Sequence, residues 1–228
     1  RRSHTATLLP SGKVLIAGGG NGVATASSQP IQSAELFDPA TGLFTLIGNM
    51  LERRSAHSAI LLDDGTVLIS AGSNGAGTLY PTNTAEVFDP ADNSFTAVGP
   101  MNYPHLAQLP GKLRDGRVVQ GSSYYNLTHT AAGGRITDES EIYDPATRTF
   151  APIAPMFKQR IDIGAQGLLD GTLLIAGGVT TSPNFPSIFQ STSEIFDPAT
   201  SSWKLSGIMS SGRDEFSGLL LDDGRVMI

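Results

Sequence analysis

The stretch AELFDPATGLF, at residues 34–44, decides how the rest of the chain is interpreted. A short apolar run precedes an Asp-Pro turn, and a second run begins at its far side. Asp can hydrogen-bond its own backbone and Pro presets φ, so this stretch predicts two antiparallel strands joined by a tight turn. The pattern recurs as AEVFDPADNSF from Ala85, SEIYDPATRTF from Ser140 and SEIFDPATSSW from Ser193.

A second landmark, an Asp-Gly or Ser-Gly turn between two apolar runs, accompanies each copy. This pattern favours a β-hairpin, because Gly adopts positive φ at little cost. The turn glycine recurs at intervals of about 50 residues, a period typical of a propeller blade. These glycines are Gly12, Gly65, Gly116, Gly171 and Gly224. Each complete repeat therefore has four strand candidates, and no stretch has a sustained helical period.

Side-chain volume increases from the first strand of each repeat to the last. Small residues such as Ala6, Ala59 and Gly164 occupy the first strand, whereas large aromatic residues occupy the later strands. In a β-propeller the blades converge near the axis and diverge outward, so the inner strands have little room for side chains. The chain is therefore predicted to be an all-β propeller.

These landmarks together resemble the kelch motif. The resemblance rests on a Gly pair after the second strand and on aromatic residues on both sides of the Asp-Pro turn. The Gly pairs are Gly18-Gly19 and Gly177-Gly178. The aromatic pairs are Phe37 with Phe44, Phe88 with Phe95, Tyr143 with Phe150, and Phe196 with Trp203. The second repeat has only Ala71-Gly72 and the third reads VVQGSS from Val118, so we expect the backbone near Gly121 to differ.

The resemblance covers the whole chain and implies one kelch-type β-propeller domain over residues 1–228. Four complete four-stranded blades are expected at about 1–50, 51–101, 102–156 and 157–209, with the first hairpin of a fifth at 210–228. Because this last repeat is incomplete, we expect a fragment of a longer chain. The chain starts with Arg1 and has no signal-peptide pattern, so we also expect the true N-terminus to be missing. A closed four-bladed ring with an extra hairpin is the less favoured alternative.

Length variation is confined to the segments that join the second and third strands. Variable loops on a rigid scaffold are where binding residues concentrate. The third segment carries the richest set: Tyr124, Tyr125, Asn126 and His129. Adjacent tyrosines beside amide and imidazole groups suit a sugar ring or a peptide. The alternative is that one Tyr packs on the blade and the other lies on the surface.

A cation occupies one equivalent position in every repeat. These residues are Arg1, Arg54, His105, Arg160 and Arg213. They could form a ring that binds acidic groups, as Arg residues do in some kelch binding domains. The favoured interpretation is instead a set of ion pairs, each with the strand Glu of the preceding repeat, because a buried Glu is costly unless paired. The strand glutamates are Glu35, Glu86, Glu141 and Glu194.

Composition excludes several classes of protein. The formal net charge of -6 argues against a nucleic-acid partner, and no apolar run is long enough to insert into a membrane. There is no Cys, which excludes disulfides and thiolate sites. The four His residues follow no metal-binding spacing and Ser, His and Asp show no triad spacing, so we expect no metal, cofactor or catalytic residue within this stretch.

Recognition is the favoured function: a non-catalytic scaffold binding a protein or glycan through the inter-strand loops of one face. The alternative is the propeller part of a secreted carbohydrate-active or galactose oxidase-like enzyme. That resemblance implies a copper cofactor with a Cys joined to a Tyr, so its catalytic residues would lie outside this stretch. A third interpretation is a structural module of a large bacterial surface protein. Few Lys and abundant Thr, Ser and Gly fit an exported bacterial protein, which predicts an extracellular or periplasmic location.

Overall fold

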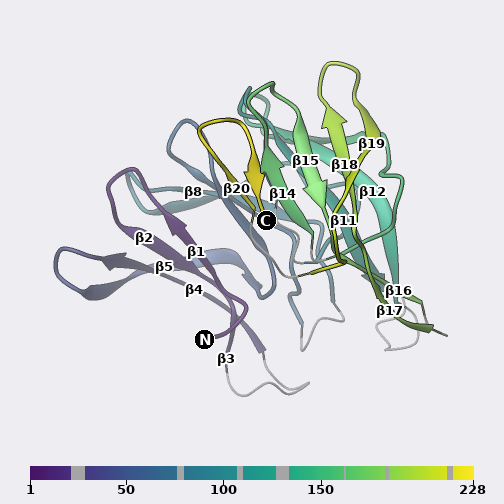
Figure 1. Ribbon diagram of the computed structural model, residues 1–228. Coiled ribbons are helices and arrows are strands. Elements are labelled where there is room, and N and C mark those ends of the chain that lie inside the picture. Colours follow the sequence, from purple (N-terminus) through teal and green to yellow (C-terminus); the bar gives the residue numbers. More distant parts are fainter. Residues whose placement is uncertain are drawn as a thin grey trace. The chain divides into compact units, whose positions relative to one another are not determined.

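A computed structural model describes residues 1–21, 29–75, 80–106, 110–126, 134–161, 163–182, 185–214 and 218–228. The chain divides into two compact units, Arg1–Ala107 and Gln108–Ile228, and each is described by itself. Within the described ranges there is no helix, and hence none that could cross a membrane (Figure 1). Paired strands are antiparallel throughout, which agrees with the all-β prediction.

The first sheet of unit 1 contains the first copy of the repeat. Its neighbouring strands are, in order, β1 (Thr5–Leu8), β2 (Val14–Ala17), β4 (Gln29–Asp38) and β5 (Leu43–Arg54), while β3 (Gly20–Asn21) pairs with the start of β4. Figure 1 shows β4 and β5 lying side by side. Gly12 closes the first hairpin with φ 82°, and the Asp38 carboxylate accepts the Ala40 N–H at 2.9 Å. The turn residues thus act as the sequence predicts.

The second sheet of unit 1 repeats this order with shorter strands. Its neighbours are β6 (Ser58–Leu61), β7 (Val67–Ser70), β8 (Ala85–Asp89) and β9 (Ser94–Ala97). The two sheets bury a common apolar core. The first sheet and its exit segment contribute Leu15, Ala17, Ala34 and Met50, and the second contributes Val67, Ile69 and Phe88. The two sheets of unit 1 therefore pack face to face, as propeller blades do.

Unit 2 contains two further four-stranded sheets. The first consists of β10 (Gly111–Lys112), β11 (Val118–Asn126), β12 (Gly134–Asp144) and β13 (Thr149–Ile153). The second consists of β14 (Gly164–Gly167), β15 (Leu173–Ala176), β18 (Thr192–Asp197) and β19 (Ser202–Ile208). Their shared core includes Val119, Ile142, Met156, Ile175, Phe196 and Trp203.

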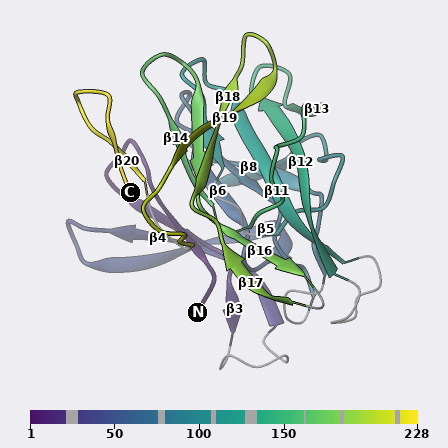
Figure 2. The ribbon, with the colours of Figure 1, turned by 45° about the vertical axis from the view of Figure 1, so that its right-hand side comes forward.

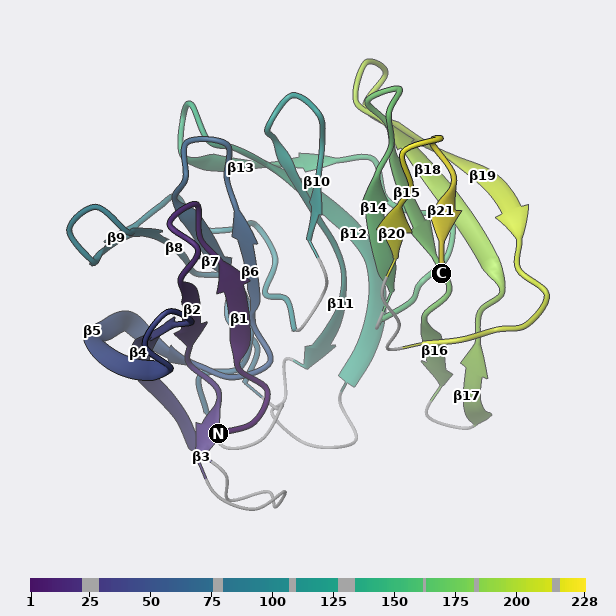
Figure 3. The same ribbon diagram turned by 60° about the vertical axis from the view of Figure 1, so that its left-hand side comes forward.

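Two short ribbons complete unit 2. β16 (Val179–Ser182) pairs with β17 (Phe185–Phe189) between the second and third strands of the last sheet, and Figure 2 shows this ribbon extending from the end of that sheet. The hairpin of β20 (Leu219–Leu220) and β21 (Val226–Met227) lies beside β14 in Figure 3. The described strands thus form one five-stranded sheet, three four-stranded sheets and two two-stranded ribbons, which is consistent with the predicted blades.

The aromatic residues around each Asp-Pro turn face one another across the third and fourth strands. Their ring centroids are 4.8 to 5.1 Å apart, which is contact distance for tilted aromatic pairs. The pairs are Phe37 with Phe44, Phe88 with Phe95, Tyr143 with Phe150, and Phe196 with Trp203. Trp203 also donates its indole N–H to the Ala154 carbonyl at 2.9 Å. These aromatic residues thus fill the outer part of each sheet.

The Gly pair marks where the second strand ends. Gly18, Gly19, Gly177 and Gly178 all have positive φ, and in the second repeat Ala71 adopts φ 64° before Gly72. The third repeat differs, as expected: β11 continues through Gly121 and pairs with β12 beyond it, with a register shift between Gly121 and Ser123. Without a left-handed pair, the chain does not turn away and the hairpin is prolonged.

Candidate functional site

The segments that vary in length lie at one end of each sheet. Because neighbouring strands are antiparallel, the connection between the second and third strands is at the end opposite the two tight turns. The chain also crosses to the next sheet at that end. The second Gly of each pair donates its N–H to the backbone carbonyl of the residue at the cation position of the following repeat. These bonds are Gly19 to Arg54 at 2.7 Å, Gly72 to His105 at 3.0 Å and Gly178 to Arg213 at 2.8 Å.

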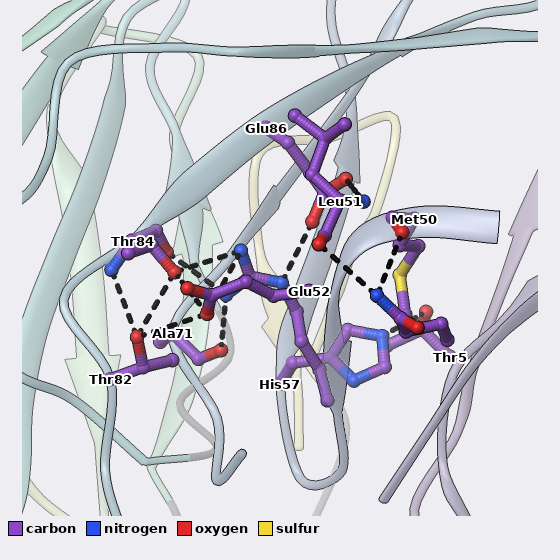
Figure 4. Close-up of polar contacts among 11 residues, drawn as sticks. Thr5, Met50, Leu51, Glu52, His57, Ala71, Thr82, Thr84 and Glu86 are labelled. Atoms are coloured by element: carbon purple, nitrogen blue, oxygen red, sulfur yellow. Dashed lines mark hydrogen bonds and ion pairs between the residues drawn. The ribbon is translucent and has the colours of Figure 1, made fainter.

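Arg54 is the centre of a buried polar cluster in unit 1, and Figure 4 labels its partners Ala71, Thr84 and Glu86. Its Nε donates to Oε1 of Glu86 at 3.0 Å, and Nη2 donates to Oγ1 of Thr84 at 2.9 Å. Nη1 donates to the carbonyls of Ala71 and Thr84, each at 3.0 Å. Arg54 is 1% exposed and Glu86 is 0% exposed, so both charges are withdrawn from solvent and satisfied by each other and by the backbone.

Glu86 also holds the crossing segment, which is the end of β5 around Leu51 that leads from the first sheet to the second. Its Oε2 accepts the backbone N–H of Leu51 at 2.7 Å, directly after the buried side chain of Met50. The amide of Gln32, on β4, donates to the carbonyl of the same Leu51 at 3.1 Å. The crossing segment is therefore held from both sheets of unit 1, and its backbone is fixed while the Leu51 side chain remains exposed.

The same cluster recurs in unit 2 around Arg160. Nη2 donates to Oε1 of Glu194 at 2.8 Å and to Oγ1 of Thr192 at 3.0 Å, and Nη1 donates to the carbonyls of Gly177 and Thr192. Glu194 accepts the backbone N–H groups of Phe157 and Lys158 at 2.7 and 3.1 Å. Burial lowers the pKa of Arg160, an effect that the charge of Glu194 opposes.

The ion pairs exist, but the predicted partners are wrong. Arg54 pairs with Glu86 and Arg160 with Glu194, each within one repeat, and Arg1 pairs with Glu35 in the first. We expected each Arg to meet the Glu of the preceding repeat. The cation lies shortly before the first strand of the sheet whose third strand carries its Glu partner, so constant spacing along the chain did not identify the contact. This buried position also removes Arg54 and Arg160 from a ligand-binding ring at the surface.

One member of the cluster was not recognised in the sequence. Two residues before each strand Glu is a hydroxyl residue that accepts from the Arg: Ser33, Thr84 and Thr192. The third repeat has Glu139 there and His105 at the cation position, so both polar positions change together. His105 is fully buried, and its backbone N–H donates to the Thr82 carbonyl at 3.2 Å. The recurrence of a hydroxyl residue two positions before the strand Glu is the sequence signal that could have identified this member of the cluster.

His57 adds a neutral imidazole next to this cluster. Its Nε2 lies 3.0 Å from Oγ1 of Thr5, on the first strand of the other sheet of unit 1. Burial, together with the nearby charges of Arg54 and His4, lowers the pKa of His57 to about 3. The ring therefore stays uncharged at neutral pH and acts as a packing and hydrogen-bonding group.

An open pocket adjoins the crossing segment of unit 1. It is lined by Gln32, Leu51, Glu52, Arg53 and Asn74. Oε2 of Glu52 accepts the Thr84 hydroxyl at 2.8 Å, and Figure 4 shows this carboxylate directed at Thr82 and Thr84. Arg53 and Asn74 are exposed, and neither side chain hydrogen-bonds or ion-pairs with any other residue that the structure describes. The pocket thus offers one anionic and one cationic group, an apolar side chain and amides.

The other predicted binding residues named below belong to unit 2. Tyr124, Tyr125 and Asn126 lie on β11, opposite Ile136, Arg135 and Gly134 of β12, so the backbone carries them on an extended hairpin. His129 lies outside the described residues. Arg213 is half-buried and donates to the Ser211 hydroxyl at 3.3 Å. The described residues contain no group of three or more acidic, His or Cys side chains that could hold a metal ion.

Two sequence comparisons find a likeness to kelch proteins. A sequence model described as the Kelch motif matches residues 1–51. Kelch-like protein 23 of Pongo abelii is 23% identical over 180 residues, which is 78% of this chain and 29% of that protein, and the Homo sapiens protein is 22% identical over the same length. The chain therefore spans less than a third of these curated relatives.

Solved structures support the same fold. The structure of YjhT superposes with a TM-score of 0.78 at 14% identity, over 99% of this chain and 79% of that one. A fungal alcohol oxidase of the AA5 family, in complex with copper, gives a TM-score of 0.54 at 20% identity, over 98% of this chain and 57% of the oxidase. At such identities these neighbours establish the fold alone. With the repeated motif and the antiparallel sheets, they show a kelch-type β-propeller fold, and the first repeat, residues 1–51, matches the Kelch motif.

Proposed function

We propose that the chain is a non-catalytic recognition scaffold that binds a protein or glycan ligand through the segments between the second and third strands. The observation that carries this proposal is the contrast at one end of each sheet. Buried Arg–Glu pairs fix the crossing backbone at Leu51 and Phe157, while the neighbouring variable segments differ in length and composition. A fixed base with variable segments is the arrangement found in loop-based binding proteins.

The pocket beside the crossing segment also supports the assignment of the binding face to this end of the sheets. Arg53 and Asn74 have donors without partners in the described part of the chain, and Glu52 is held by Thr84. Polar groups held on a rigid base and left available to a ligand provide orientation and specificity. The acidic composition supports a protein or glycan partner in preference to nucleic acid. We propose an extracellular or periplasmic location for this activity.

A test uses an array of immobilised glycans and a library of displayed peptides as probes. Tyr124→Ala with Tyr125→Ala changes the longest variable hairpin, and Ser11→Ala with Thr41→Ala changes two turns at the opposite end of a sheet. We expect the first pair to weaken binding to whichever probe is retained and the second pair to leave it unchanged. Unchanged binding by the first double variant and loss of binding in the second, both at unchanged melting temperature, would place the binding face at the opposite end.

A second candidate is the propeller portion of a carbohydrate-active or galactose oxidase-like enzyme. The likeness to a copper-containing fungal alcohol oxidase favours it. This chain has no Cys for a Cys–Tyr cofactor, so in that case the catalytic residues lie outside residues 1–228. Copper content and alcohol turnover of the full-length gene product distinguish the two: stoichiometric copper with turnover supports the enzyme, and an inactive copper-free product that retains ligand binding supports the scaffold.

A further inference from the structure

The Asn74-Gly75 dipeptide lies at the edge of the pocket beside the crossing segment of unit 1. We propose that Asn74 is a site of spontaneous deamidation, in which the backbone nitrogen of Gly75 attacks the side-chain amide and a carboxylate replaces it. The modification needs no enzyme and no cofactor. It is independent of the function proposed above, because it depends only on the chemistry and surroundings of these two residues.

Both reacting groups of this dipeptide are available. The Asn74 side chain is exposed and has no hydrogen-bond partner among the described residues. The N–H of Gly75, which supplies the attacking nitrogen, likewise donates to no atom that the structure describes. The backbone of Asn74 is nevertheless held, because its own N–H donates to the Tyr80 carbonyl at 3.2 Å.

Two other Asn residues of unit 1 show the opposite arrangement. The Asn83 side chain donates to the Met101 carbonyl at 3.0 Å, and the following N–H, of Thr84, is occupied by the Thr82 hydroxyl at 3.2 Å. After Asn93, the N–H of Ser94 donates to the Asp92 carboxylate at 3.0 Å. A nitrogen that is already donating a hydrogen bond must lose that bond before it can attack. The structure therefore protects Asn83 and Asn93 and leaves Asn74 open.

Packing explains why Gly follows Asn74. A Cβ atom at Gly75 would lie 2.4 Å from Cδ2 and 2.6 Å from Cγ of the Tyr80 ring, which no ordinary contact allows. The Tyr80 ring thus excludes any side chain at this position. The same lack of a side chain removes the steric hindrance that slows attack by the backbone nitrogen in other Asn-X sequences. The tertiary contact therefore requires the residue that makes the dipeptide reactive.

The reaction balances with water as the only co-reactant. The Gly75 nitrogen loses its proton and bonds to Cγ of Asn74, the bond from Cγ to Nδ2 breaks, and ammonia leaves, giving a five-membered succinimide. Water then adds to one of the two ring carbonyls and opens the ring. Attack at one carbonyl gives Asp, and attack at the other gives isoaspartate, in which the main chain runs through the side-chain carbon. No oxidation or reduction takes place.

The product changes the charge of the pocket. Glu52 and Arg53 contribute opposite charges, so their sum is zero, and conversion of Asn74 adds one negative charge to the pocket that the exposed Arg53 also lines. Charge-changing modifications act through such local pairing and repulsion. The aged protein should therefore bind acidic probes at this pocket less tightly than the fresh protein.

The test is peptide mapping of the folded protein during storage at mildly acidic and mildly alkaline pH. Cleavage after Arg54 and Lys112 gives one peptide that carries Asn74, Asn83 and Asn93, so the protected residues are internal controls. We expect a mass increase of about 1 Da that maps to Asn74, forms faster at alkaline pH and includes isoaspartate. Asn83 and Asn93 should remain intact in the same sample.

Denatured protein and one variant complete the design. In urea the protecting hydrogen bonds are lost, so Asn93 should deamidate faster than in the folded protein while Asn74 stays reactive. Asn74→Gln should abolish the mass change at this position, because attack on the longer side chain requires a less favourable ring. Equal rates at Asn74 and Asn83 in the folded protein, or an unmodified Asn74 after prolonged alkaline storage, would overturn the proposal.

Discussion

The carboxylate of Glu86 and the guanidinium of Arg54 form a buried ion pair within one repeat, with 3.0 Å between Oε1 and Nε. The second carboxylate oxygen accepts the N–H of Leu51, on the segment that leaves the preceding sheet. One carboxylate therefore connects the sheet that carries it with the exit of the preceding sheet. The Arg160–Glu194 pair repeats this arrangement in unit 2, which makes it a repeated structural element and the first target for mutation.

Removal of Arg160 should destabilise unit 2 strongly. Arg160→Ala leaves Glu194 buried without its cation, and breaking a buried ion pair costs about 3–5 kcal/mol of unfolding free energy. Arg225→Ala is the control, because Arg225 pairs with Asp223 at the surface and such pairs contribute about 0–1 kcal/mol. Urea denaturation of both variants measures the difference. A melting temperature of Arg160→Ala equal to that of the wild type would contradict the structural role.

The Gly pair should be intolerant of side chains for a reason beyond its backbone angles. Gly178 and Gly171 both have φ of 89°, so Ala at either position costs roughly 1–2 kcal/mol in left-handed strain. At Gly178 the added Cβ would also lie 2.5 Å from the Ile161 carbonyl, whereas nothing lies within 4 Å at Gly171. We expect Gly178→Ala to lower the free energy of unfolding by at least about 1 kcal/mol more than Gly171→Ala. Equal losses in chemical denaturation would refute the close approach.

Ala71 is a position where replacement by Gly should stabilise the protein. It holds φ 64° at the position where the first and fourth repeats have Gly, so its native backbone is strained. Ala71→Gly should raise the free energy of unfolding by about 0.5–1 kcal/mol, since relief of strain exceeds the added freedom of the unfolded chain. Ala85→Gly, in the middle of the sheet, should lower it by about 0.5–1 kcal/mol. A destabilised Ala71→Gly variant would show that the Ala side chain contributes packing that outweighs the strain.

Unit 1 should lose stability in mild acid through His57. Its pKa is about 3 in the folded protein and 6.5 unperturbed, so below pH 6.5 the unfolded chain takes up a proton that the folded one does not. Its contribution is complete above the unperturbed pKa and is lost as the pH falls toward the folded value, by on the order of a few kcal/mol. His57→Gln should flatten this part of the profile. Parallel stability curves for the two proteins over this window would disprove the assignment.

The sequence by itself determined the repeat, the strands and the turns. Asp-Gly, Asp-Pro and Gly-Gly act through local dihedral preferences, which depend on neighbouring residues alone, so the sheets and their order follow from spacing. The change at Gly121 was also visible, because a missing Gly pair removes the left-handed turn. The aromatic pairs were recognisable because the strand register places equivalent positions opposite each other.

Only the tertiary structure decided which charges meet. Constant spacing suggested that Arg54 would pair with Glu35, but its partner is Glu86, 32 residues further along the chain, and only the approach of strands in space selects it. The requirement for Gly at position 75 likewise depends on the folded structure, because the Tyr80 ring packs where a Cβ atom would lie. Local preferences fix the path of the backbone, whereas long-range contacts select its partners, and that selection separates a buried structural ion pair from a binding group.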